Sequence, residues 1–74
     1  MKATLKFDLP DEALEFDWAV NAGKMYYMLW DLDQWLRSNT KYAPDDMSDD
    51  TYKAFEQCRE KLRELMTERN IGFN

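Results

Sequence analysis

Asp31 and Asp33 are the residues whose type and spacing come closest to a catalytic site, since two neighbouring carboxylates can act as general acid and general base. Their segment has helical periodicity, and residues two apart on a helix point about 200° away from each other. The two carboxylates therefore cannot act as one pair unless the helix breaks between them. The sequence offers no stronger candidate, because it has no histidine, one cysteine and two glycines that form no phosphate-binding loop. We expect no catalytic residue, no cofactor and no enzymatic activity.

Metal binding is not expected either. A single cysteine without histidine cannot supply the nitrogen and sulfur ligands of a closed zinc site. An EF-hand loop needs a glycine at its sixth position and a closing glutamate, and both are missing around the aspartates at 45, 46, 49 and 50. These aspartates are better explained as capping and solvated residues. Cys58 is predicted to be a small buried hydrophobe, because it lies on the apolar side of a predicted helix.

An acidic row is the first candidate for binding. Four glutamates recur at every fourth position, with neighbours about 6 Å apart along a helix: Glu56, Glu60, Glu64 and Glu68. This spacing is similar to that of phosphates along one DNA strand, as in proteins that mimic DNA. The stretch from Asp8 to Asp50 adds eleven acidic residues against three basic ones, a net charge of −8. The alternative is an ordinary solvated helix surface that Arg59 and Arg63 partly neutralise.

Aromatic residues provide the second candidate for binding. Tyr26, Tyr27 and Trp30 lie opposite the expected core side of their helix, beside Arg37, and Trp18 lies on the corresponding side of the preceding segment. Tyrosine, tryptophan and arginine are the residues most enriched at binding hot spots. These five residues are therefore the predicted partner-binding residues. The alternative is a second core layer, in which the aromatic rings pack against a neighbouring helix.

A strand and three helices are expected to position these residues. Residues 2–9 alternate apolar and polar, which predicts a strand with one buried face. Pro10 and the acids after it favour a first helix over about 11–21, and Gly23 is placed to end it. A second helix is predicted over 24–38, with one arc of core residues: Met25, Met28, Leu29, Leu32, Trp35 and Leu36.

The third helix is predicted over 49–69. Ser48 is suited to cap its first turn, and Asn70 and Gly72 to end it. Its expected inward residues are Phe55, Cys58, Leu62, Leu65 and Met66. The chain is thus predicted to be one mainly α domain over 1–74. Its lone strand would need a partner, which could be residues 71–73 or the same strand of a second copy, giving a homodimer.

Composition limits the possible partners. The net charge of −5 disfavours direct binding to nucleic acid and favours a protein partner. No apolar run is long enough to cross a membrane, and residues 2–9 alternate where a signal peptide would be apolar. We therefore expect no membrane binding and a soluble protein of the cytoplasm.

Six segments spread over most of the chain carry a resemblance to a known group of proteins: Lys2 to Pro10, Glu15-Phe16, Ala19-Val20, Leu29 to Asp33, Leu36 to Ser38 and Lys41-Tyr42. They look like parts of small proteins encoded by tailed bacteriophages. The resemblance implies a phage protein that works in the bacterial cytoplasm. Small phage proteins without enzymatic machinery often bind and redirect or inhibit host proteins.

The resulting expectation is a non-catalytic, homodimeric protein-binding module that modulates or inhibits a host or phage protein. One alternative is an acidic DNA mimic that inhibits a nucleic-acid-binding enzyme. The other is a structural or assembly accessory that acts by self-association.

Overall fold

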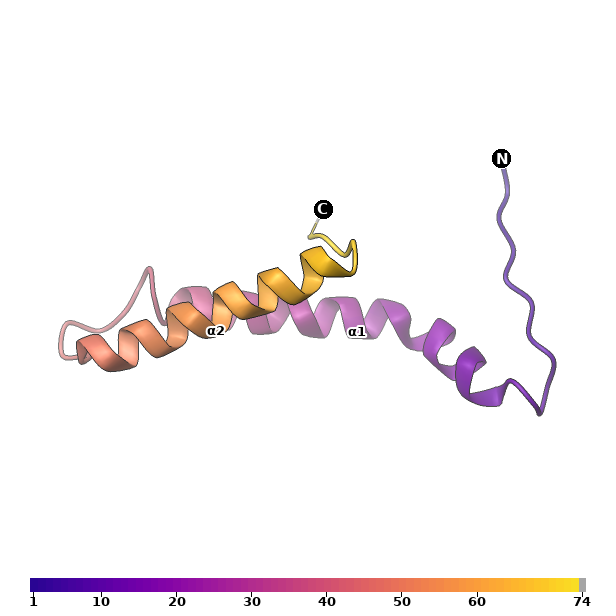
Figure 1. Ribbon diagram of the computed structural model, residues 1–74, viewed down its shortest axis with the longest axis horizontal. Coiled ribbons are helices and arrows are strands. Elements are labelled where there is room, and N and C mark those ends of the chain that lie inside the picture. Colours follow the sequence, from indigo (N-terminus) through magenta and orange to yellow (C-terminus); the bar gives the residue numbers. More distant parts are fainter. Residues whose placement is uncertain (74) are drawn as a thin grey trace.

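Two antiparallel helices make up the fold (Figure 1). The computed structural model describes residues 1–73, with α1 at Ala13–Ser38 and α2 at Asp49–Glu68. Residues 39–48 connect them, so that the end of α2 returns to the middle of α1. The helical character predicted from the sequence is confirmed, but the predicted fold of one strand and three helices is wrong.

No strand is present in residues 1–73. Residues 1–9 extend away from the helices, and no strand of residues 1–73 lies beside them (Figure 1). The alternation of apolar and polar residues at 2–9 therefore does not indicate a strand in this structure. Phe7 packs edge-on against Phe16 at 5.7 Å between ring centroids, while the backbone has no neighbouring chain to pair with. The dimer that depended on strand pairing loses its structural basis.

The break expected between the helices at 11–21 and 24–38 is also absent, because α1 continues through both. Gly23 has an ordinary helical backbone, and a Cβ added there would meet nothing within 4 Å. One glycine costs a helix only about 1 kcal/mol relative to alanine. That cost is too small to end a helix whose flanking residues, Ala22 and Lys24, favour helical structure.

The ends of α2 follow from its sequence. The Ser48 hydroxyl accepts a hydrogen bond from the backbone N–H of Thr51 at 3.2 Å, which caps the first turn. At the other end Asn70 adopts a left-handed conformation with φ of 56°, and Ile71 N–H donates to the Met66 carbonyl at 2.9 Å. The helix predicted over 49–69 corresponds to α2.

The core is very small. Among the described residues, Leu36 and Met66 are the buried hydrophobic residues, and Asp33 is the buried charged one. The radius of gyration is 17.4 Å, against about 11 Å for a compact chain of this length. Part of α1 extends beyond the end of α2 with no second helix beside it (Figure 1).

Most of the arc expected to be core on 24–38 is exposed. Met25, Met28, Leu32 and Trp35 are 44%, 63%, 44% and 56% exposed. The reason is that α2 packs on one edge of this arc, against the stripe that contains Leu29, Asp33 and Leu36. On α2, Cys58 was expected to be buried and is exposed.

Candidate functional site

Asp33 joins the two helices. Its carboxylate is completely buried and accepts hydrogen bonds from two arginines of α2. Arg63 donates from Nε to Oδ1 at 2.9 Å and from Nη2 to Oδ2 at 2.7 Å. Arg59 donates to the same oxygens at 3.1 and 3.4 Å. The two arginines lie one turn apart on the side of α2 that faces α1. One carboxylate can therefore accept hydrogen bonds from both guanidinium groups.

These contacts shift both partners toward their charged forms. The hydrogen bonds from Arg63 lower the pKa of Asp33 below its usual value, and they outweigh the burial of the carboxylate, which raises it; Arg59 adds a further lowering. The hydrogen bonds to Asp33 in turn raise the pKa of Arg63. Both guanidinium groups remain partly exposed, at 30% and 48% of their side chains. The cluster therefore carries one net positive charge at neutral pH and acts as a link between helices.

Asp33 was missed as a structural residue by the sequence reasoning, which considered it only beside Asp31. The structure places Asp31 on the exposed surface of α1, so the two carboxylates do not meet. One signal was present in the sequence. Asp33 continues the spacing of Leu29 and Leu36 along one stripe, where an acid requires a cation from the facing helix.

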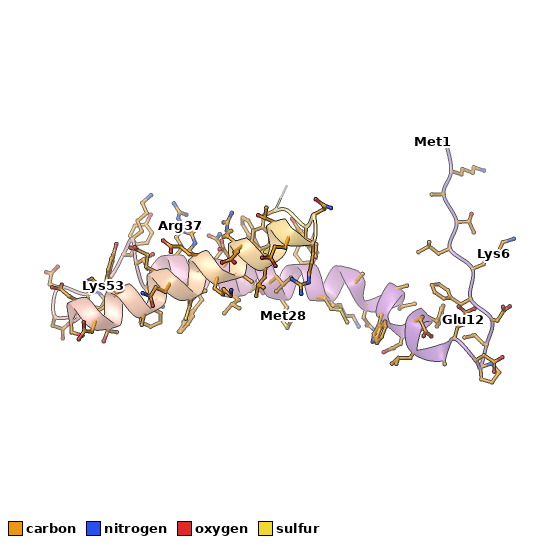
Figure 2. The ribbon with its side chains drawn as sticks, viewed as in Figure 1. Met1, Lys6, Glu12, Met28, Arg37 and Lys53 are labelled. Atoms are coloured by element: carbon orange, nitrogen blue, oxygen red, sulfur yellow. The ribbon has the colours of Figure 1, made fainter. Side chains whose placement is uncertain are left out.

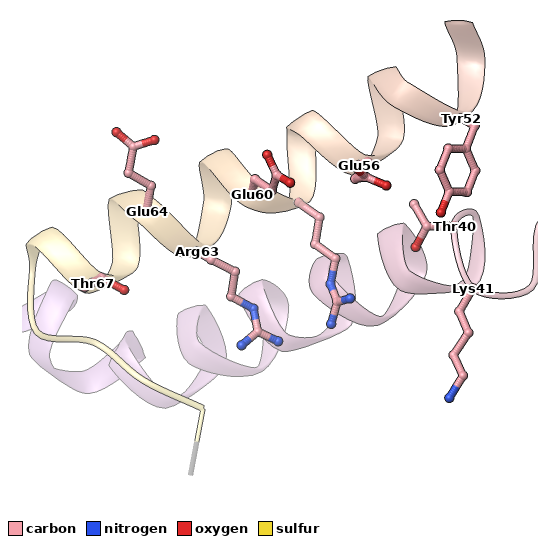
Figure 3. A pocket seen from close by; sticks show the side chains of 9 residues that line it. Thr40, Lys41, Tyr52, Glu56, Glu60, Arg63, Glu64 and Thr67 are labelled. Atoms are coloured by element: carbon pink, nitrogen blue, oxygen red, sulfur yellow. The ribbon is translucent and has the colours of Figure 1, made fainter. Parts of the chain in front are cut away.

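Three members of the acidic row, Glu56, Glu60 and Glu64, lie on the outer edge of α2 (Figure 3). All four glutamates are exposed. Arg59 and Arg63, which were expected to neutralise the row, both bind Asp33 instead. Figure 3 shows the Arg63 side chain directed toward α1. Within residues 1–73 the ion pairs of the row are long ones, from Lys61 to Glu64 at 3.5 Å and from Arg69 to Glu68 at 3.9 Å. Within residues 1–73, Glu56 and Glu60 have no ion pair.

An open groove of about 830 Å³ lies between the acidic row and the connection of the helices (Figure 3). Glutamates of the row, both arginines of the cluster and Lys41 line it. Because three acidic and three basic side chains line it, the groove favours neither an anion nor a cation.

The predicted partner-binding residues divide into two groups. Tyr26 and Trp30 meet at Phe73, whose ring packs edge-on against them at 5.8 and 5.2 Å between centroids. Tyr27 packs edge-on against Tyr26 at 5.5 Å. We name Tyr26, Tyr27, Trp30 and Phe73 the aromatic patch. The role of Phe73 was not foreseen, because the tail was considered only as a possible strand.

The other predicted residues lie apart from the aromatic patch. Arg37 is half-buried two turns after Trp30 on the same side of α1. Trp18 is exposed twelve residues before Trp30, about 18 Å away along the helix and on a different side. The structure therefore brings three of the five predicted residues together.

A second surface comes from the residues that were expected to be core. Trp35 of α1 contacts Phe55 of α2 with ring centroids 5.5 Å apart, so the apolar stripes of both helices lie on the same side of the hairpin. We name this surface the apolar face. It comprises Met25, Met28, Leu32 and Trp35 of α1 and Phe55, Cys58, Leu62 and Leu65 of α2. Met28 and Arg37 project from opposite edges of α1 (Figure 2), which separates the apolar face from the side of α1 that carries Trp30.

Comparisons with known proteins found no match among family models, curated proteins or solved structures. Neither described helix combines the length and apolar character needed to cross a membrane.

Proposed function

We propose that this chain is a non-catalytic protein-binding module that binds its target through the aromatic patch. The observation that carries the proposal is the packing of Phe73. Its ring is held between Tyr26 and Trp30, and the Arg63 guanidinium lies 5.1 Å from its centroid. Tyr27 and Trp30 stay exposed on this support.

Such an arrangement favours binding energetically. Aromatic side chains that are already positioned lose little conformational entropy when a partner covers them. Exposed tyrosine and tryptophan beside arginine is also the composition of a binding hot spot. The resemblance to small tailed-phage proteins supports a host or phage protein in the bacterial cytoplasm as the target, and modulation or inhibition as the outcome.

The proposal is tested by affinity capture from phage-infected bacterial cells with the wild-type chain and with Tyr27→Ala and Trp30→Ala. Tyr42→Ala is the matched control, because Tyr42 is 68% exposed and Tyr27 66%. We expect one protein to be retained by the wild type and by Tyr42→Ala. Its affinity for the patch variants should fall by about 30-fold, the effect of losing a hot-spot residue. Equal retention by all four chains would reject the patch as the binding surface.

A second candidate function, a DNA mimic, is favoured by the direction of Arg59 and Arg63. Because both guanidinium groups bind Asp33, the charges of Glu56 and Glu60 remain available to a basic DNA-binding surface. A mimic should compete with duplex DNA for the captured protein, and added salt should weaken its binding. Glu56→Gln with Glu60→Gln should abolish the competition, while Asp45→Gln with Asp46→Gln removes the same charge elsewhere and should not.

A further inference from the structure

We propose that a second copy of this chain covers the apolar face, so that two hairpins form a four-helix homodimer. The inference is independent of the proposed function, since it concerns the opposite side of the molecule from the aromatic patch. It also differs from pairing through residues 2–9, for which the structure shows no strand.

The apolar residues of α1 have the spacing of a helix that packs against other helices. Leu14, Trp18, Asn21, Met25, Met28, Leu32 and Trp35 follow one another at alternating intervals of four and three residues. This repeat averages 3.5 residues and continues for three heptads, as in helices that pack side by side in coiled coils and bundles. Within α1 it includes Leu14 and Trp18 on the part that extends beyond α2. Packing of α1 against α2 within one hairpin does not require the repeat to continue beyond the end of α2.

The same spacing occurs on α2. Phe55, Cys58, Leu62 and Leu65 follow at intervals of three, four and three residues. The contact between Trp35 and Phe55 places this repeat beside that of α1. None of the eleven positions in the two repeats carries a charge, although 34% of the chain is charged. Charged residues are depleted in this way where a helix side is covered.

The chain also exposes more surface than a compact monomer of its size. The chain exposes 6533 Å², whereas a compact folded monomer of 8.9 kDa exposes about 4,800 Å². The difference is about 1,700 Å². Part of it belongs to residues 1–9, which extend away from the helices (Figure 1). A standard protein interface needs about 800 Å² from each partner, roughly half of this excess. The excess exposed area of the chain is therefore large enough to include one partner's share of a stable dimer interface.

The small core decides between a second copy and a foreign partner. With two buried hydrophobic residues in the described part of the chain, one hairpin has too little core to fold firmly alone, and domains of this size commonly gain stability by oligomerisation. The partner that buries the apolar face must then be present whenever the chain folds. A second copy always meets this condition, and its apolar face has the same repeat, so the two faces can pack across a two-fold axis.

Light scattering at about 50 µM tests the proposal, because association follows protein concentration. We expect a mass twice 8.9 kDa for the wild type. Met28→Glu places a charge in the apolar face and should give a single-chain mass. Val20→Glu is the matched control and should stay dimeric, because Val20 is 62% exposed, as Met28 is at 63%, but lies on another side of α1. Tyr27→Ala should also stay dimeric, which separates this result from a failure of the proposed function.

Two outcomes would overturn the homodimer. One is a folded wild-type monomer at about 50 µM whose thermal midpoint does not change with concentration. The other is a dimer that Met28→Glu leaves intact. If Met28→Glu unfolds, the wild type decides: its thermal midpoint must rise with protein concentration, since dissociation and unfolding are then coupled.

Discussion

Arg63 donates two hydrogen bonds, at 2.9 and 2.7 Å, to the completely buried carboxylate of Asp33, thirty residues earlier in the chain. Arg59 binds the same carboxylate from one turn away. Because the apolar core is limited to Leu36 and Met66 within the described residues, this cluster makes a large share of the specific contact between the helices.

Removing the carboxylate should destabilise the fold. Asp33→Ala leaves two guanidinium groups without their acceptor, and we expect a loss of about 2 to 3 kcal/mol in the free energy of unfolding, since the partly exposed arginines regain some hydration. Urea unfolding followed by circular dichroism measures it. Asp31→Ala is the control, with a change of about 0.5 kcal/mol or less, because Asp31 is exposed. Equal effects of the two variants would contradict the structural role of Asp33.

The stability should also depend on pH through Asp33. Its pKa in the folded chain is lowered, so unfolding at low pH takes up a proton that the folded carboxylate resists. The stabilisation is therefore fully present above the usual carboxyl value of 3.8 and is lost as the pH falls through the lower folded value. Unfolding midpoints at several pH values between about 2 and 6 should show a steeper acid loss for wild type than for Asp33→Asn. Parallel curves would contradict the prediction.

Gly23→Ala should stabilise the protein. Gly23 is helical, exposed and has open space where a Cβ would lie, so alanine adds helix propensity without a clash. We expect a gain of about 0.5 to 1 kcal/mol in unfolding free energy. The reverse change at the adjacent exposed position, Ala22→Gly, should cost a similar amount. A loss of stability in Gly23→Ala would show that the helix needs a glycine there.

The thiol of Cys58 should report the proposed dimer. It is exposed in the single chain and lies within the apolar face. We expect its rate of reaction with a thiol reagent to fall as protein concentration rises, because the second copy covers it. Met28→Glu should remove this dependence and Val20→Glu should keep it. A rate independent of concentration in the wild type would place Cys58 outside any interface.

Local signals in the sequence predicted α2 well, and tertiary contacts decided the rest. Ser48 and Asn70 act within one turn of the chain, so their capping roles depend on few other residues. The alternation of residues 2–9 is compatible with a strand, but a strand also needs a neighbouring strand, and residues 1–73 provide none. Gly23 weakens a helix without ending it.

The candidate site likewise has features that depend on local sequence and features that depend on tertiary contacts. Periodicity identified the apolar arc of α1 and the acidic row of α2 as surfaces with distinct chemistry. It could not show which edge of the arc would receive α2, because that choice depends on the pairing of Asp33 with two distant arginines. Nor could it place Phe73 against Trp30, since that contact requires the chain to return along α1.

The Asp33 cluster also sets the alignment of the two helices along their length. Two apolar side chains could slide past one another at little cost, but a shift of α2 by one turn would move it about 5.4 Å and take one of the two arginines out of reach of the carboxylate. Buried polar groups are best known for setting such register. Asp33 thereby determines which residues of α2 stand beside Trp35 and Leu32, and so the pattern of knobs and holes that any covering partner would meet.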